Sequence, residues 1–206
     1  MELVIASNNP HKIRELRAIF KTLFPKHLPC DLRSLLDFPQ YVAPPETEDT
    51  FEGNAKLKAA HAAAALNRWT IADDSGLVVP ALGGDPGVYS ARYAGAQATD
   101  VENRKKLLSQ MQHLLDEDRN GYFECWIAVA SPAGVKKCTH GICEGTILTE
   151  EKGGGGFGYD PLFVKHGYRK TFAEIEETIK TQVSHRGKAM RSLLPFLESL
   201  FSTVEV

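Results

Sequence analysis

The chain has 206 residues, 43% hydrophobic and 24% charged, a composition typical of a soluble globular protein that buries a core without disulfide support. Its 24 basic and 26 acidic residues leave a net charge of −2, which does not favour a protein that coats nucleic acid but allows a local basic pocket. The four cysteines have no CxxC spacing, no secretory signal precedes the first strand and no apolar run nears the roughly 18 residues of a membrane span, so we expect a cytoplasmic protein with free thiols, no zinc site and no membrane partner.

The first predicted elements are a strand and a helix. Residues 3–6 form a short apolar run that is typical of a buried strand. Asn9 can cap the helix that follows, and Pro10 suits its first position. Pro25 and Pro29 bound this helix. The apolar residues that repeat at helical spacing along it are Ile13, Leu16, Ile19, Phe20 and Leu23.

The next segment combines prolines with an acidic cluster, and residues 30–50 are predicted to be irregular. From about Thr50 to Asn67 the chain is rich in alanine, which predicts a helix. Asp49 with Glu52 resembles a capping box for this helix, with aspartate in place of the usual serine or threonine.

Two adjacent carboxylates follow a short apolar strand. Residues 69–72 form the predicted strand, Asp73 and Asp74 stand where it is expected to stop, and glycines punctuate residues 83–95. Carboxylates beside flexible backbone suit a hard metal ion and a phosphorylated substrate. If the strand continues, the two side chains alternate, so that only one needs to face a site. The alternative is an ordinary turn.

The second half of the chain predicts one helix and a β-hairpin. Thr99 and Glu102 form a capping box. Residues 122–130 and 135–143 are β-rich, and residues 131–134 between them carry a hairpin signal. The side chains expected to face inward from the helix are Val101, Leu107, Leu108, Met111 and Leu115.

The last predicted elements are two short strands and a helix. The strands cover residues 146–148 and 161–164, and the helix begins near Ser184, with Pro195 expected to kink or break it. Its apolar stripe consists of Met190, Leu193, Leu194, Leu197, Leu200 and Phe201. Helices that alternate with strands early in the chain, followed by a hairpin, predict an α/β protein with a mixed sheet.

Two further segments of the first half carry candidate chemistry. Residues 7–12 form a strand-to-helix turn whose backbone N–H groups and Lys12 could bind an anion, although the glycines of a P-loop are missing and the segment could be only a capped helix. Glu46 precedes a helix on which Asn54 and Lys58 share a face. The alternative is a solvated helix.

Two more candidates lie near the end of the chain. Residues 153–160 combine four glycines with Phe157 and Tyr159, whose rings offer planar faces for a nucleobase. The alternative is a flexible hairpin loop. Lys180 and residues 184–188 could donate hydrogen bonds into a pocket, or they could form a basic surface turn.

The order and spacing of these motifs resemble one family. The resemblance rests on Ser7-Asn8-Asn9 to Lys12, Thr50-Phe51 with Asn54-Ala55 and Lys58-Ala59, Ala72 to Gly76, Pro86 to Tyr93, Gly156 to Pro161 and Ser184 to Ala189. Over roughly residues 2–200 the chain is similar to the inosine/xanthosine triphosphate pyrophosphatases, also called the HAM1-like family.

The resemblance implies a single catalytic domain over residues 1–206, with two lobes around a long mixed β-sheet flanked by helices and a nucleotide in the central cleft. It implies hydrolysis of the non-standard purine nucleotides ITP, dITP and XTP to the monophosphate and pyrophosphate, which keeps them out of DNA and RNA. It also implies Mg²⁺ and a homodimer, with no stable nucleic-acid complex.

The resemblance also assigns roles to individual residues. Glu46 and Asp74 match metal ligands, and Asp74 is in addition the expected catalytic residue. The expected contacts to the phosphates and the neighbouring parts of the substrate are Ser7, Asn8, Asn9, Pro10, His11, Lys12, Asn54, Lys58 and Ser75. The expected contacts to the base and its flanks are Phe157, Gly158, Tyr159, Asp160, Lys180, His185 and Arg186.

The loop before the alanine-rich helix departs from the family pattern. The family often has a glycine before Thr50, whereas this chain has Pro45-Glu46-Thr47-Glu48-Asp49. Glu48 and Asp49 are therefore alternative metal ligands. Two other functions remain open: a Maf-like pyrophosphatase of modified pyrimidine triphosphates, and a nucleotide sensor that does not catalyse.

Overall fold

The computed structural model describes residues 1–26 and 30–202. Within these residues no helix is both long and apolar enough to cross a membrane. The helices are α1 (Pro10–Leu23), α2 (Phe51–Leu66), α3 (Asp100–Gln110), α4 (Glu177–Val183) and α5 (His185–Ser202). The strands are β1 (Glu2–Ile5), β2 (Asp31–Ser34), β3 (Trp69–Val78), β4 (Asn120–Ser131), β5 (Gly134–Ile147) and β6 (Phe163–Lys165).

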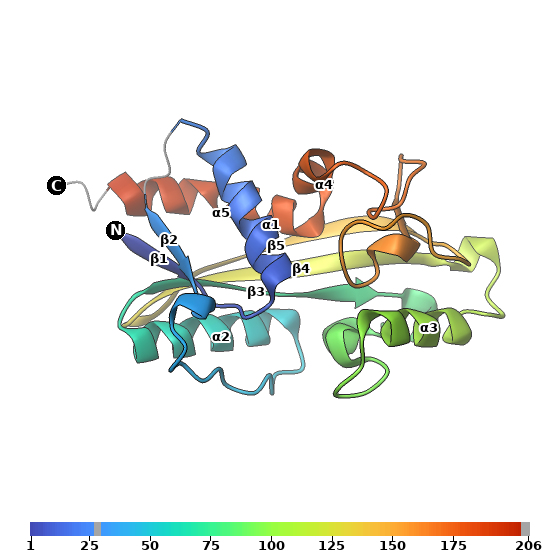
Figure 1. Ribbon diagram of the computed structural model, residues 1–206, viewed down its shortest axis with the longest axis horizontal. Coiled ribbons are helices and arrows are strands. Elements are labelled where there is room, and N and C mark those ends of the chain that lie inside the picture. The colour runs from blue at the N-terminus through green and yellow to red at the C-terminus, as the bar shows by residue number, and fades with distance from the viewer. Residues whose placement is uncertain (27–29, 203–206) are drawn as a thin grey trace. The chain divides into compact units, whose positions relative to one another are not determined.

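The strands of the described residues form one six-stranded sheet in the order β2-β1-β3-β4-β5-β6 (Figure 1). β1 pairs in parallel with β2 and with β3, whereas β5 pairs antiparallel with β6. The predicted α/β fold with a mixed sheet is confirmed. The predicted hairpin is confirmed as well, because only Pro132 and Ala133 separate β4 from β5.

The chain divides into two compact units. The first unit consists of residues 1–74, 125–141 and 186–206, and the second of residues 75–124 and 142–185. The division does not test the prediction of a single catalytic domain or of a nucleotide cleft, and both stay predictions.

In the first unit the sheet carries helices on both faces (Figure 1). Leu3, Ile5 and Ile71 belong to a core with apolar residues of α1 and α5, whereas Val4 and Ala72 belong to a core with the buried alanines of α2. Successive side chains of a strand point to opposite faces, so within the first unit the odd-numbered residues of β1 and β3 face α1 and α5 and the even-numbered residues face α2.

The second unit has its own core, which is rich in aromatic side chains. Phe123, Phe163 and Phe172 contact one another, with ring centroids 4.7, 5.0 and 6.0 Å apart. Leu107 of α3 and Met111, which caps that helix, are fully buried in the same core.

Several predicted boundaries are wrong. Residues 31–34 are not irregular but form β2. This segment is polar and shows no strand pattern, and it is a strand because its backbone pairs with that of β1. The strand that begins at Trp69 does not stop at Asp73 but continues to Val78. Residues 146–148 are not a separate strand, because β5 runs without interruption to Ile147.

Some helix predictions also need correction. The N-cap of α2 is Thr50, whose hydroxyl accepts from the Gly53 N–H, so the capping box expected at Asp49 is wrong. Val101 and Leu115 are exposed rather than inward, because α3 ends at Gln110 and Val101 lies in its first turn. Pro195 does not break α5, which stays helical from His185 to Ser202.

Candidate functional site

Asp73 and Asp74 lie in the middle of β3, and both are buried. Because successive side chains of a strand point to opposite faces, the two neighbouring carboxylates lie on opposite faces of the sheet. Asp73 contacts residues of α1 and α5, and Asp74 contacts a residue of α2. The predicted alternation of the pair is confirmed, although the strand does not end there.

Asp73 is held by two cations. The Lys12 Nζ lies 3.2 Å from its Oδ2, and Arg186 donates to the same oxygen from Nε at 3.2 Å and Nη2 at 2.9 Å. Arg186 also pairs with Glu15 through Nη1. Burial alone would raise the pKa of Asp73, but the charges of Lys12 and Arg186 outweigh it and hold the pKa well below its ordinary value.

Asp74 shares one cation with a carboxylate from a distant loop. The Lys58 Nζ donates to Asp74 Oδ1 at 2.7 Å and to Glu46 Oε1 at 3.0 Å. Burial raises the pKa of Asp74 although Lys58 acts in the opposite direction. Burial alone would lower the pKa of Lys58, but Asp74 and Glu46 raise it overall. One ammonium group therefore pairs with two carboxylates.

The loop that carries Glu46 is tied to α2 by Asn54. This side chain is fully buried, and its amide accepts from the Glu48 N–H at 3.1 Å and donates to the Glu48 carbonyl at 3.0 Å. Gly53 faces the same loop, since a Cβ there would stand 2.7 Å from the Glu48 Cβ. Asn54, an expected substrate contact, therefore lies beneath the loop and holds it against the helix.

The turn at residues 7–12 has the predicted cap. The Asn9 side chain accepts from the backbone N–H groups of His11 at 2.9 Å and Lys12 at 3.3 Å, and Ser7 Oγ accepts from the Asn9 N–H at 3.1 Å. Asn8, Asn9 and Pro10 are exposed. The start of α1 is therefore exposed to solvent beside Lys12, but the cap occupies the N–H groups of His11 and Lys12, so the expected anion-binding turn stays a prediction.

The second unit holds residues 157–160, which we call the aromatic segment. Asp160 Oδ2 accepts from the Phe157 N–H at 2.9 Å and pairs with the buried Lys180 Nζ at 2.5 Å. The same ammonium group lies 5.3 Å from the ring centre of Phe157 and 5.6 Å from that of Phe172. Asp160 and Lys180 thus hold the Phe157 ring beside a positive charge.

The remaining predicted residues differ in exposure. His185 is 5% exposed, and its ring stacks on Phe123 with centroids 4.8 Å apart and an interplanar angle of 13°. Arg186 is 1% exposed and belongs to the Asp73 network described above. Ser75 is half-buried and follows Asp74 in β3.

Glu15 is a member of the Asp73 network that local sequence patterns did not single out. It lies three positions after Lys12 on α1, and side chains at this spacing share a helix face. That spacing was a usable signal. Its partner Arg186 lies 171 positions away, which no local pattern reveals.

The possible metal donors around Lys58 are carboxylates, which suit a magnesium ion. Among the described residues no cluster of three or more histidine, cysteine, aspartate and glutamate side chains gathers. Glu46 and Asp74 provide two carboxylates at one point, because both reach the same Lys58 ammonium. Mg²⁺ is commonly held by one or two carboxylates, with phosphate oxygens and water completing its shell.

Comparisons with known proteins show the family of the chain. The sequence model of the Ham1 family matches residues 3–196. A protein named dITP/XTP pyrophosphatase from Protochlamydia amoebophila is 54% identical over 201 residues, which is 97% of this chain and 99% of that protein. A protein of the same name from Chlamydia trachomatis serovar L2 is 50% identical over 203 residues, 98% of this chain and 95% of that protein.

Solved structures show the same likeness. The Ham1 protein of Staphylococcus aureus has 42% identity and a TM-score of 0.82, and the comparison covers 97% of this chain and 99% of that one. A HAM1 protein from Coxiella burnetii has 37% identity and a TM-score of 0.84, with the same coverage.

Proposed function

Because the chain belongs to the Ham1 family, we propose that it hydrolyses the non-standard purine nucleotides dITP, XTP and ITP to the nucleoside monophosphate and pyrophosphate. The activity would remove these nucleotides before they enter DNA or RNA. The resemblance found in the sequence and the named relatives support the same substrate class.

One observation of the structure carries this proposal furthest: the Lys58 ammonium lies 2.7 Å from Asp74 and 3.0 Å from Glu46. Glu46 comes from a loop and Asp74 from the middle of β3. A purely structural ion pair needs only one carboxylate, and a second one would stay partly uncompensated. Two carboxylates around one lysine suit a site that receives both a cation and phosphate groups.

We propose Glu46 and Asp74 as the ligands of Mg²⁺. When bound, the ion would neutralise charge on the triphosphate and polarise it toward attack. Lys58, which lies against both carboxylates, would then be available to a phosphate oxygen.

Asp74 is also proposed to position the attacking water and accept its proton. The water oxygen would bond to the α-phosphorus while the bond from that phosphorus to the bridging oxygen breaks and pyrophosphate departs. Lys12, at the start of α1, would offset charge on the phosphates together with Lys58.

The base is proposed to contact residues 157–160, Lys180 and His185, whereas the nitrogen atoms of Arg186 are occupied by Asp73 and Glu15. Hypoxanthine and xanthine carry an acceptor oxygen at position 6, where adenine carries an amine that donates. Buried donors pair with the oxygen and are left unpaired by the amine, which can cost a factor of about 10⁴ in favourable cases. Phe157 would stack on the ring and add affinity without choosing the base.

Pyrophosphate release from ITP, XTP, dITP, ATP, GTP and dTTP with Mg²⁺ tests the proposal. We expect the first three to exceed ATP by about 100-fold or more in kcat/KM. A preference for dTTP would support the Maf-like alternative, and binding of ITP without turnover would support the sensor.

Two further properties belong to the proposal through the family resemblance. We expect a homodimer, which sedimentation equilibrium of the purified protein would measure, and a cytoplasmic location, which fractionation of the source cells would measure. Omitting Mg²⁺ from the assay, with a chelator present, should abolish turnover, and full activity under these conditions would contradict the metal requirement.

A further inference from the structure

Helix α3 holds both peptide groups that flank Gly158. The Gly158 N–H donates to the Asp100 carboxylate at 2.6 Å, and the Gly158 carbonyl accepts from Arg104 Nη1 at 2.8 Å. Asp100 and Arg104 stand four positions apart in α3, so both side chains leave the same face of the helix. The two contacts thus form a clamp of opposite charges around one residue.

The clamped residue is the conformational pivot of the aromatic segment. Gly158 has φ +60°, a left-handed value that side-chain-bearing residues rarely adopt. Its N–H belongs to the peptide group shared with Phe157, and its carbonyl to the one shared with Tyr159. Fixing both peptide groups therefore fixes the direction in which each aromatic side chain leaves the backbone.

Two other contacts of the aromatic segment involve the neighbours of Gly158. Asp160 accepts from the Phe157 N–H within the segment itself, and the Tyr159 hydroxyl donates to the Ser90 carbonyl at 2.9 Å. These contacts fix the two ends of the segment, whereas Asp100 and Arg104 bind its centre.

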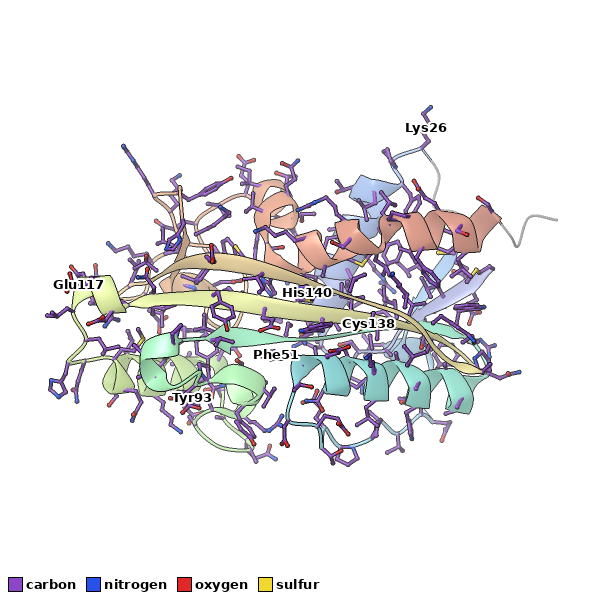
Figure 2. All side chains as sticks on the ribbon, turned by 180° about the vertical axis from the view of Figure 1, so that it is seen from behind. Lys26, Phe51, Tyr93, Glu117, Cys138 and His140 are labelled. Atoms are coloured by element: carbon purple, nitrogen blue, oxygen red, sulfur yellow. The ribbon has the colours of Figure 1, made fainter. Side chains whose placement is uncertain are left out.

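The same helix also anchors the segment that receives Tyr159. The Asn103 amide donates to the Ala91 carbonyl at 3.1 Å and accepts from the Ala94 N–H at 2.8 Å, and Lys106 donates to the Tyr93 carbonyl at 2.6 Å. Figure 2 marks Tyr93 beside this helix. Polar side chains of α3 therefore hold the backbone of residues 91–94 as well as that of Gly158.

Arg104 is itself restrained. Its Nε lies 2.9 Å from Glu151 Oε1, and only 11% of its side chain is exposed. A restrained, charged donor forms a stronger hydrogen bond than a mobile neutral one, since less side-chain entropy is lost. Asp100 is exposed and lies in the first turn of α3, where an acidic side chain stabilises any helix. An experiment on Asp100 must therefore separate helix stabilisation from the hydrogen bond to Gly158.

From these contacts we infer that Asp100 and Arg104 are positioning residues, which set the Phe157 ring in the orientation that stacks on the purine. The inference rests on the proposed function, because it takes Phe157 as the residue that contacts the base. Neither Asp100 nor Arg104 is proposed to contact the substrate directly. Their influence should appear in substrate affinity and depend on Phe157.

The first experiment measures KM and kcat for ITP in Arg104→Met, Arg104→Lys and the matched control Lys105→Met. Lys105 is exposed on the same helix, and its replacement removes the same charge. We expect KM to rise about 10-fold in Arg104→Met with kcat unchanged, partial recovery in Arg104→Lys, and wild-type values in the control. An equal loss of kcat and stability with unchanged KM would overturn the inference.

A double-mutant cycle of Arg104→Met with Phe157→Ala measures whether the two effects on KM are coupled. A purely structural role of Arg104 would not produce such coupling. If Arg104 acts through Phe157, then Arg104→Met should add little to the raised KM of Phe157→Ala. Additive effects would overturn the inference, and so would an unchanged KM in Phe157→Ala itself. Inhibition by inorganic tripolyphosphate, which lacks a base, should be the same in wild type and Arg104→Met, whereas inhibition by IMP should weaken.

Asp100 provides an independent test if Arg104→Met does not fold. Asp100→Asn removes the charge but keeps an acceptor for the Gly158 N–H, whereas Asp100→Ala removes both. A raised KM only in Asp100→Ala supports positioning, and equal effects in both variants contradict it. Turnover of ITP, XTP and dITP by the wild type is measured first. Its absence would refute the proposed function, and its presence with unaffected variants would refute only the inference.

Discussion

The guanidinium of Arg186 donates two hydrogen bonds to one carboxylate oxygen of Asp73, a residue 113 positions earlier in the chain. The side chains expose 1% and 0% of their surface. Charges this deeply buried are tolerated only when they are paired, so the contact links α5 to β3 within the first unit.

Asp73→Asn should lower the free energy of unfolding by about 3 kcal/mol, because it leaves the buried Arg186 and the neighbouring Lys12 undercompensated. Urea unfolding followed by circular dichroism measures the change. Asp31→Asn is the matched control: its pair with Arg33 is half exposed on both sides and should change stability by less than about 1 kcal/mol. Equal stability of Asp73→Asn and wild type would contradict the network.

Asp74→Asn should reduce kcat for ITP about 10³-fold or more while the fold survives. Asparagine keeps an oxygen that can accept from Lys58, and the Lys58 ammonium keeps its ion pair with Glu46. Steady-state kinetics and a thermal melt together measure this. Glu52→Gln on the outer face of α2 serves as the control, since the ion-pair partner of Glu52 among the described residues is the half-exposed Lys56. Near-normal activity in Asp74→Asn would remove that residue from the chemical step.

Phe157→Ala should raise KM about tenfold for ITP, XTP and dITP alike, because stacking on a ring contributes affinity that does not depend on the substituents of the base. The comparison of the three KM values is the measurement. A change confined to one base would contradict a stacking role and would indicate that the segment reads the base directly.

His185→Phe should narrow the gap between ITP and ATP turnover while preserving the packing against Phe123, whose ring stacks on that of His185. Phenylalanine keeps the planar ring and removes both ring nitrogens, so it isolates hydrogen bonding from packing. The ratio of kcat/KM for ITP and ATP is the quantity to compare. An unchanged ratio would assign the reading of the base to other residues.

Burial raises the pKa of Cys30 from its ordinary value of 9.0 to about 11. The unfolded chain therefore releases this proton at lower pH than the folded chain, and the stability that the neutral thiol provides is present below pH 9 and lost as the pH rises toward 11. The Tm of wild type should fall over this interval more than that of Cys30→Ala. Parallel curves for the two proteins would contradict the shifted pKa.

Local patterns were sufficient for much of the fold. The cap at Asn9, the capping box at Thr99 and Glu102 and the hairpin at residues 131–134 were predicted, because each depends on neighbours in the chain. The order and spacing of the motifs along the chain also indicated the family, since they can be read without knowing which segments meet in space.

Elements that depend on distant partners escaped prediction. β2 has no apolar alternation and exists because it pairs with β1, and β3 extends past two aspartates because cations from three helices compensate their charges. Short-range periodicity carries no information about such partners.

From the sequence by itself it followed that Asp73 and Asp74 would point in opposite directions if the strand continued through them, because alternation is a property of any extended strand. Only the tertiary structure decided which carboxylate meets Lys12 and Arg186 and which meets Lys58 and Glu46. Those partners come from separate helices and a loop, and they meet only after the apolar faces of α1, α2 and α5 have packed on the sheet.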